Sequence, residues 1–280
     1  MELSAVCLLG KIQKEKITKE LGEDTVNIFV ENPNDTGAYN VVLEIIIDKF
    51  FNYVETKVTE FKNEYISKYL YKKGSSNGTD FTPTAKITTP EKTFQNKIIK
   101  SYEETINAYK KTKDVEFLEK IHNTLISNKD KILSDISKNF DSKKGTILTV
   151  VYDNKYIGDL EIFRDKLRQD AVKNYYLIDG KESRNKDKTC SICKEKNKEV
   201  YGNANVFKFY TVDKEGYVAG GFKKLDSWRN FPVCLDCAVE LELGKRYLDE
   251  NLSFKFQGRD FYLIPKLVFE KDTERILSIL

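Results

Sequence analysis

Four of the five cysteines form two pairs, Cys190-x-x-Cys193 and Cys234-x-x-Cys237, and this pattern restricts the possible folds more than any other feature of the chain. A C-x-x-C pair places two thiolates on one tight turn, and two such pairs supply the four ligands of a tetrahedral Zn²⁺ site. The 40 residues between the pairs exceed the spacing of a compact zinc ribbon. We therefore predict a structural zinc ion bound by all four sulfurs, with a β-strand insertion between the two half-sites.

Other uses of the four cysteines are less consistent with the pattern. Disulfides need an oxidising compartment, and a thioredoxin-type redox centre needs only one C-x-x-C pair. An iron–sulfur cluster uses the same number of thiolates, so the spacing leaves it open. Catalytic zinc is disfavoured because four thiolates leave no position for an activated water. Cys7 lies alone in an apolar stretch and is interpreted as a small buried hydrophobic residue.

The composition is that of a folded protein with a well-solvated exterior. The 280 residues are 40% hydrophobic and 32% charged, and the formal net charge is only +3. Basic residues outnumber acidic ones between Lys181 and Arg229, where Tyr210, Tyr217 and Trp228 also lie, which indicates a local basic and aromatic surface. The N-terminus lacks signal-peptide features and no long apolar run is present, so we expect a cytoplasmic protein that does not enter a membrane.

The first half of the chain predicts a mixture of strands and helices. Two adjacent β-rich segments, "VVLEIIID" and "FFNYVETKVTEF", predict a hairpin, and residues 74–88 predict an exposed loop. Thr89 and Pro90 predict a helix start, after which apolar residues recur at spacings of three and four. That stripe consists of Phe94, Ile98, Tyr102, Ile106 and Tyr109, and it continues through Phe117, Ile121, Leu125, Ile132, Ile136 and Phe140. Two or three helices are expected here.

The second half predicts further hairpins around the cysteine module. "GTILTVVYDNKYIGDLEIF" predicts strands that turn at Asp153-Asn154, and "RDKLRQDAVKNYY" predicts a helix. "GKESRNKDK" is interpreted as a charged linker, residues 238–248 as a helix, and "LSFKFQGRDFYLIPKLVF" as a hairpin that turns near Gln257-Gly258. "KDTERILSIL" is interpreted as the start of a further helix.

The predicted fold class is therefore α+β, a helical layer with β-hairpins and an inserted four-cysteine module similar to a zinc ribbon. The expected domains are an N-terminal α+β domain (1–180), a zinc-binding module (181–250), and a C-terminal hairpin with the start of a further helix (251–280).

Nothing in the sequence predicts an enzyme. His122 is the only histidine and lies in the helical region, so neither a Ser-His-Asp triad nor a histidine metal site can be assembled. No phosphate-binding G-x-x-x-x-G-K-[ST] loop is present. A carboxylate-only nuclease stays open among 44 acidic residues, although no pair with a defined spacing indicates one.

Several longer stretches carry a family resemblance. They are "FTPTAKITTPEKTF", "YIGDLEIF", "CSICKEKNKEVYG", "FKFYTVDKEGYVAGGFKKLDSWRNFPVCLDCAVELELGKRYLDENLSFKF" and "YLIPKLV". Together they resemble the N-terminal half of the large subunit of subtype I-B CRISPR interference complexes, the Csh1-type branch of the Cascade large subunits. The resemblance runs from about Tyr65 onward and is weaker before that residue.

This resemblance implies a non-enzymatic subunit of a crRNA-guided surveillance complex, and a chain that is a fragment of a longer protein. The subunit would lie beside the one that binds the crRNA 5′ handle, help to recognise the protospacer-adjacent motif on double-stranded DNA, and support R-loop formation before a helicase-nuclease is recruited. The family's metal-binding positions correspond to Cys190, Cys193, Cys234 and Cys237.

The resemblance does not say which side chains contact nucleic acid, so candidates come from exposed basic segments. Reading a short duplex motif requires donors that reach base edges and cations that fix the backbone. One predicted loop supplies Lys72, Lys73, Asn77 and Lys86, and the segment between the cysteine pairs supplies Lys223, Lys224, Trp228 and Arg229. A free-standing zinc-dependent nucleic-acid-binding protein is the alternative interpretation, and it predicts tight, salt-sensitive binding by the chain alone.

Overall fold

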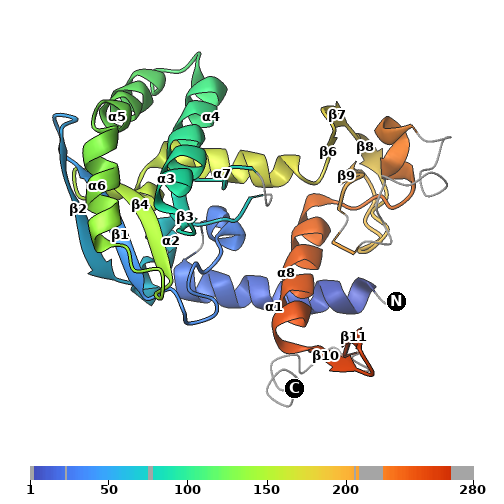
Figure 1. The fold of residues 1–280 in the computed structure, drawn as a ribbon. Helices are drawn as coiled ribbons and strands as arrows, with labels where there is room; N and C mark the ends of the chain where they lie inside the picture. The colour runs from blue at the N-terminus through green and yellow to red at the C-terminus, as the bar shows by residue number, and fades with distance from the viewer. Residues whose placement is uncertain (1–2, 23, 75–77, 205, 208–222, 266–280) are drawn as a thin grey trace. The chain divides into compact units, whose positions relative to one another are not determined.

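The computed structural model describes residues 3–22, 24–74, 78–204, 206–207 and 223–265 (Figure 1). The chain divides into two compact units, one formed by residues 1–23 together with 171–280 and the other by residues 24–170. This division differs from the predicted boundary at residue 180, because the N-terminal segment packs with the C-terminal part of the chain. The predicted mixture of helices and small sheets is confirmed.

A mixed five-stranded sheet forms the centre of the unit that spans residues 24–170. Its order is β2-β1-β4-β3, with β5 paired to β4. The strands are β1 (Val41–Ile47), β2 (Tyr53–Glu60), β3 (Thr84–Lys86), β4 (Thr146–Tyr152) and β5 (Lys155–Tyr156). The hairpin predicted from the two β-rich segments is confirmed as the antiparallel β1–β2 pair. The parallel pairing of β1 with β4 joins segments about a hundred residues apart, and no local sequence pattern predicts it.

Helices accompany this sheet in the order that the apolar stripe predicts (Figure 1). They are α2 (Ile66–Tyr69), α3 (Pro90–Thr93), a π-helical segment (Phe94–Ile99), α4 (Lys100–Tyr109), α5 (Val115–Ser127), α6 (Lys129–Asn139) and α7 (Glu161–Lys173). Pro90 occupies the first turn of α3 as predicted, although the Thr89 side chain makes no capping hydrogen bond. The stripe residues Phe94, Ile98, Tyr102 and Ile121 are fully buried, so the apolar spacing identified the core-facing side of these helices.

The exposed loop predicted at residues 74–88 is wrong for its second half. Thr82 and Thr84 are fully buried, and Thr84–Lys86 forms β3 against β4. The hydroxyls of Thr82 and Thr84 donate to the backbone carbonyls of Leu70 and Tyr69, both at 2.7 Å. Because these hydrogen bonds satisfy the polar groups, residues that are typical of loops can be buried here.

Glu44 is a buried carboxylate in the middle of this sheet, with only 4% of its surface exposed. Its Oε1 accepts hydrogen bonds from the Tyr156 hydroxyl at 2.7 Å and the Thr59 hydroxyl at 2.9 Å. Burial and the hydrogen bond to Glu44 raise the pKa of Tyr156, so the phenol stays protonated and donates to the carboxylate.

Replacing Tyr156 with phenylalanine is expected to lower the free energy of unfolding by about 2 kcal/mol, since it leaves a buried carboxylate with one donor fewer. Denaturant unfolding measures this change. Tyr152→Phe is the matched control, because the Tyr152 hydroxyl donates to the Lys49 carbonyl at an exposed site and its loss should cost well under about 1 kcal/mol. Equal losses for the two variants would show that the buried carboxylate does not depend on Tyr156.

Two long helices dominate the second unit. They are α1 (Leu3–Leu21), which the sequence analysis did not predict, and α8 (Leu235–Asn251), which it did. The backbones of α1 and α8 approach closely where a glycine replaces a side chain: a Cβ at Gly10 would lie 1.7 Å from the Glu240 carbonyl oxygen, and one at Gly244 would lie 2.0 Å from that of Val6. Only glycine permits this contact.

Short hairpins complete the second unit. They are β6 (Leu177–Ile178) with β7 (Lys181–Glu182), β8 (Arg184–Lys188) with β9 (Lys198–Tyr201), and β10 (Ser253–Phe256) with β11 (Arg259–Tyr262). The last of these confirms the predicted turn at Gln257-Gly258, where both residues have positive φ. The charged linker predicted at residues 180–188 is wrong, because this segment forms β7 and β8. Both faces of these strands carry polar side chains, so the sequence lacks the alternation of apolar and polar residues that predicts a strand. The helix predicted at residues 271–280 lies outside the described residues.

None of the helices in the described part of the chain is long and apolar enough to span a membrane.

Candidate metal centre

The second cysteine pair lies at the start of α8. Cys234 is the N-cap residue of the helix, and Cys237 lies in its first turn. Both side chains are buried, each with 4% of its surface exposed. The unpaired backbone N–H groups and the dipole at a helix N-terminus favour negative charge, so this position stabilises thiolates.

The first pair lies on a tight turn between β8 and β9. The Cys190 N–H donates to the Glu195 carbonyl at 3.0 Å, and the Lys194 N–H donates to the Cys190 carbonyl at 3.1 Å, which closes the turn. Lys194 adopts a positive φ of 62°, the left-handed conformation that this turn requires. The Ser191 N–H donates to the Pro232 carbonyl at 2.8 Å, and this bond ties the turn to the segment that enters the second pair.

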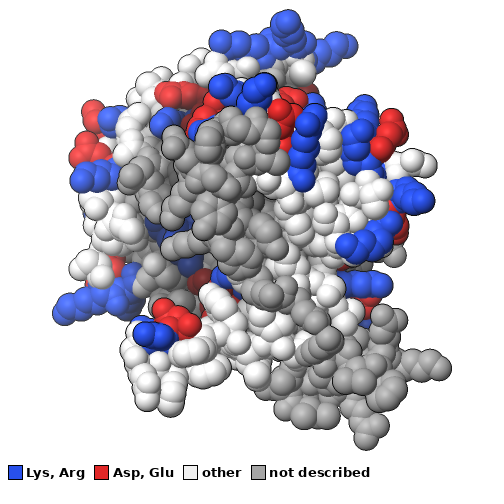
Figure 2. Space-filling view, turned by 90° about the vertical axis from the view of Figure 1, so that its right-hand side faces the viewer, with Lys and Arg blue, Asp and Glu red and all other residues white. Residues whose placement is uncertain are grey.

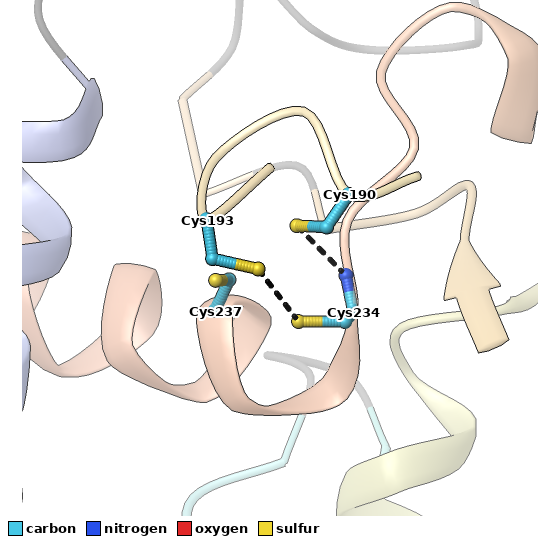
Figure 3. A group of neighbouring side chains, drawn as sticks. All are labelled: Cys190, Cys193, Cys234 and Cys237. Atoms are coloured by element: carbon cyan, nitrogen blue, oxygen red, sulfur yellow. Dashed lines mark hydrogen bonds between the residues drawn. The ribbon is translucent and has the colours of Figure 1, made fainter. Parts of the chain in front are cut away.

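The four sulfurs converge on one point (Figure 3). The four Sγ atoms all lie within 4.8 Å of one another, and those of Cys193 and Cys234 are 3.9 Å apart. A tetrahedral ion with Zn–S bonds of about 2.3 Å requires sulfurs about 3.8 Å apart. The predicted assembly of Cys190, Cys193, Cys234 and Cys237 into one group is therefore confirmed, and its size fits a single bound metal ion.

Hydrogen bonds in the group concentrate negative charge on Cys190. The thiols of Cys234 and Cys237 donate to Cys190, as do the backbone N–H groups of Cys234 and Ile192, and together they lower the pKa of the Cys190 thiol. The same contacts with Cys190, together with burial, raise the pKa values of the Cys234 and Cys237 thiols. A divalent cation would supply the charge that allows the remaining thiols to ionise.

This ligand set suits a structural metal rather than a catalytic one. Four thiolates complete a tetrahedral coordination shell, so no position is left for water or substrate. Three of the four cysteines are buried and only Cys193 is exposed. The metal would join the β8–β9 turn to the first turn of α8.

Cys7 lies close to the group without being one of its four members. It is buried, as predicted, and its Sγ donates to the Cys237 carbonyl at 3.4 Å. Its Sγ also lies within 4.8 Å of the Cys237 sulfur and a Glu240 carboxylate oxygen. Burial raises the pKa of Glu240. Cys7 thus links α1 to the start of α8.

The predicted nucleic-acid-binding residues of the first segment differ in solvent exposure and in ion pairing. Lys72 is buried with 7% of its surface exposed, and its Nζ lies 3.3 Å from Glu31 Oε1. The Lys86 Nζ pairs with Asp35 at 2.8 Å. Lys73 is exposed, and Asn77 lies outside the described residues. Ion pairing and burial thus leave Lys72 the least accessible of these candidates.

Of the predicted residues of the second segment, Trp228 lies beside Lys188 of β8, the strand that leads into Cys190. Lys223 and Arg229 are exposed, and Lys224 forms an ion pair with Asp179. Trp228 is half-buried, with the Lys188 Nζ at 5.7 Å and the Arg229 guanidinium carbon at 5.3 Å from its ring centroid. Trp228 therefore holds two cations beside the metal module.

The sequence does not single out Lys186 and Lys188, because a charged run without apolar alternation is typical of a linker. Both lie on β8, which leads into Cys190. Lys186 is exposed and makes no ion pair within the described ranges. Lys188 stands directly opposite Lys198 of β9. Lys198 already pairs with Glu195 at 2.8 Å, so Lys186 and Lys188 are the cations of these two strands that we consider for contact with an anion.

Two family comparisons cover most of the chain. Residues 3–169 match the N-terminal domain of CRISPR-associated protein TM1802, and residues 187–280 match the central domain of the same protein. The first match alone spans more than half of the 280 residues. The chain belongs to the TM1802 family of CRISPR-associated proteins. All four cysteines of the metal group lie within the match to the TM1802 central domain.

No curated protein and no solved structure matches the chain.

Proposed function

We propose that this protein acts as a non-catalytic part of the large subunit of a type I-B crRNA-guided interference complex, the Csh1-type Cascade large subunit. Membership in the TM1802 family supports this proposal. The chain matches the N-terminal domain of that family and, after it, the central domain. The proposed partners are the crRNA-containing subunits, above all the one that binds the crRNA 5′ handle, together with double-stranded target DNA. A helicase-nuclease would be recruited later.

The proposed role is to recognise the protospacer-adjacent motif and to support R-loop formation. In guided effectors, base pairing with the RNA reads the long target, and the protein reads only a short duplex motif. Such a protein needs donors for base edges and cations for the backbone, and it needs no catalytic group. The chain fits this requirement, with basic side chains around the metal module and a metal site whose four ligands leave no open position.

The metal is proposed to be zinc. The close spacing of the four sulfurs supports a single ion, since an iron–sulfur cluster places several irons and sulfides between its thiolates and holds them farther apart. Zinc with four thiolates is the common structural centre of this kind. Elemental analysis of the native protein should find one zinc per chain and no iron with acid-labile sulfide.

The proposed contact with nucleic acid centres on the basic residues next to the cysteines. Figure 2 shows Lys and Arg side chains over the upper and right-hand parts of one face, several of them beside Asp and Glu. The overall charge of this surface is thus mixed. Lys186, Lys188 and Arg229 lie close to Trp228 or to the first cysteine pair, and a phosphate there would neutralise adjacent cations.

Electrophoretic mobility shifts test the proposed function. With crRNA and its binding subunits present, the protein should shift a target duplex that carries the correct adjacent motif, and it should bind weakly when alone. Tight, salt-sensitive binding by the isolated chain would instead support a stand-alone zinc-dependent nucleic-acid-binding protein. Labelled DNA incubated with the chain and Mg²⁺ or Mn²⁺ should stay intact, and metal-dependent cleavage would contradict a non-catalytic role.

Charge reversal at Lys186 and Lys188 should weaken DNA binding by the assembled complex at least tenfold and reduce the slope of affinity against salt concentration by about two, one unit per lost phosphate contact. Titrations at several salt concentrations measure both quantities. Lys129→Glu with Lys131→Glu, on α6 in the other unit, is the matched control and should leave affinity unchanged. Equal effects of the two pairs would indicate a general charge effect instead of a local contact.

A further inference from the structure

The β10–β11 hairpin exposes an unusual amount of apolar surface. Among the described residues, eleven large hydrophobic side chains are exposed, and five of them belong to this short segment. They are Phe254, Phe256, Phe261, Tyr262 and Leu263. Clustered apolar exposure of this kind marks an interaction site more often than scattered residues do.

The register of the hairpin separates its two faces. Phe254 pairs with Phe261 and Phe256 with Arg259, so these four side chains share one face, which we call the aromatic face. The Phe254 and Phe261 rings stack with centroids 5.7 Å apart, and Phe256 meets Phe261 edge-on at 6.3 Å. The three rings therefore form a continuous apolar surface with one guanidinium at its end.

The opposite face contacts α8 through Tyr262 and Ser253 at the base of the hairpin. The Tyr262 hydroxyl donates to Asp249 Oδ1 at 2.7 Å, and the Lys245 Nζ lies 2.6 Å from the same carboxylate. The Leu263 N–H donates to the Leu252 carbonyl at 2.9 Å, which closes the base of the hairpin. These contacts hold the polar face against the helix, so the aromatic face points away from it.

The hairpin also offers free backbone edges. Within the described part of the chain, β10 and β11 form a sheet of only two strands, so each strand has one unpaired edge. An isolated two-stranded hairpin is marginally stable in water, and a third strand would supply both hydrogen bonds and apolar cover. An added strand is a common mode of protein recognition.

We propose that the aromatic face of β10–β11 is a docking site for another protein subunit, which pairs an extended apolar segment with a free edge of the hairpin and places a carboxylate opposite Arg259. The charges favour a protein over a nucleic acid. Arg259 is the only charged residue on the aromatic face, and Lys255 stands opposite Asp260 on the other face. Nucleic-acid surfaces need several cations along the backbone, whereas aromatic residues with one arginine are typical of protein–protein contact centres.

The inference rests on the proposed function to the extent that the partner is a subunit of the same complex. The test immobilises the assembled crRNA-containing subunits on a surface and measures the affinity of the chain for them in the absence of target DNA. The affinities of the variants are compared with that of the wild-type chain. A variant with Phe254→Thr, Phe256→Thr and Phe261→Thr keeps strand-compatible residues and should bind at least tenfold more weakly. Arg259→Glu should weaken binding about tenfold by reversing the charge opposite the expected carboxylate.

Controls separate docking from folding and from the proposed function. Val54→Ser with Val58→Ser removes exposed apolar surface from β2 and should leave binding unchanged. Each variant is checked for wild-type metal content and thermal midpoint. If the wild-type chain does not bind the subunits, the proposed function is contradicted. If the triple variant binds them as tightly as the wild-type chain does, only the docking site is overturned. Unchanged subunit binding with weakened DNA binding would show that the face contacts nucleic acid, and would also overturn it.

Discussion

Replacing Cys234 and Cys237 with serine is expected to release the metal and to loosen the connection between the β8–β9 turn and α8. The two serines remove half of the ligand set, and a hydroxyl is a poor ligand where a thiolate is needed. Structural zinc contributes about 10–16 kcal/mol of apparent binding free energy in zinc-finger peptides, so its loss should destabilise the surrounding segments strongly. The metal content should fall from about one ion per chain to below about 0.1 ion per chain.

Elemental analysis measures the metal, and limited proteolysis measures the loosening, with new cleavage expected within residues 184–204 and 223–234. The matched control is Cys7→Ala, which removes a buried sulfur that donates to the Cys237 carbonyl but belongs outside the group of four. This control should keep its metal. Full metal content in the double serine variant would show that these cysteines are not the ligands.

Replacing Gly10 with alanine is expected to separate α1 from α8 and to lower the free energy of unfolding by more than about 3 kcal/mol, because a Cβ would collide with the Glu240 carbonyl oxygen at 1.7 Å. That oxygen belongs to the helix backbone, so no side-chain rotation relieves the clash. Gly244→Ala should behave in the same way, since its Cβ would lie 2.0 Å from the Val6 carbonyl oxygen.

Thermal and denaturant unfolding of the purified chain check this expectation. Lys11→Ala is the matched control, because Lys11 neighbours Gly10 on the same helix, is exposed, and should change stability by less than about 0.5 kcal/mol. Wild-type stability of both glycine variants would mean that α1 and α8 do not pack at the distance described.

The cysteine group is the part of the structure that the sequence predicted best. Its chemistry is local, since each C-x-x-C pair defines one turn and four thiolates around one ion leave few arrangements. The hairpins at Asp153-Asn154 and Gln257-Gly258 were predictable for a similar reason, because their turn residues adopt the positive φ that such turns require.

Long-range packing was not predictable in this way. The parallel pairing of β1 with β4 and the contact of α1 with α8 each depend on segments far apart in the chain. The sequence does not show the role of Gly10 and Gly244, since a glycine within a helix usually indicates a less stable helix and not a close contact between two helices. β8 was missed because Arg184, Lys186 and Lys188 give no apolar alternation, although their backbone pairs with β9.

The packing of α1 against α8 also sets an order of events during synthesis. Residues 24–170 form a contiguous unit that can collapse as soon as it leaves the ribosome, whereas α1 meets α8 only after more than two hundred further residues have been made. Until then its apolar stripe, with Val6 and Leu9, has no permanent cover. The nascent chain therefore exposes the apolar side of α1 while residues 22–234 are made, and chaperone binding to that helix is the expected consequence of pairing two segments so far apart in the sequence.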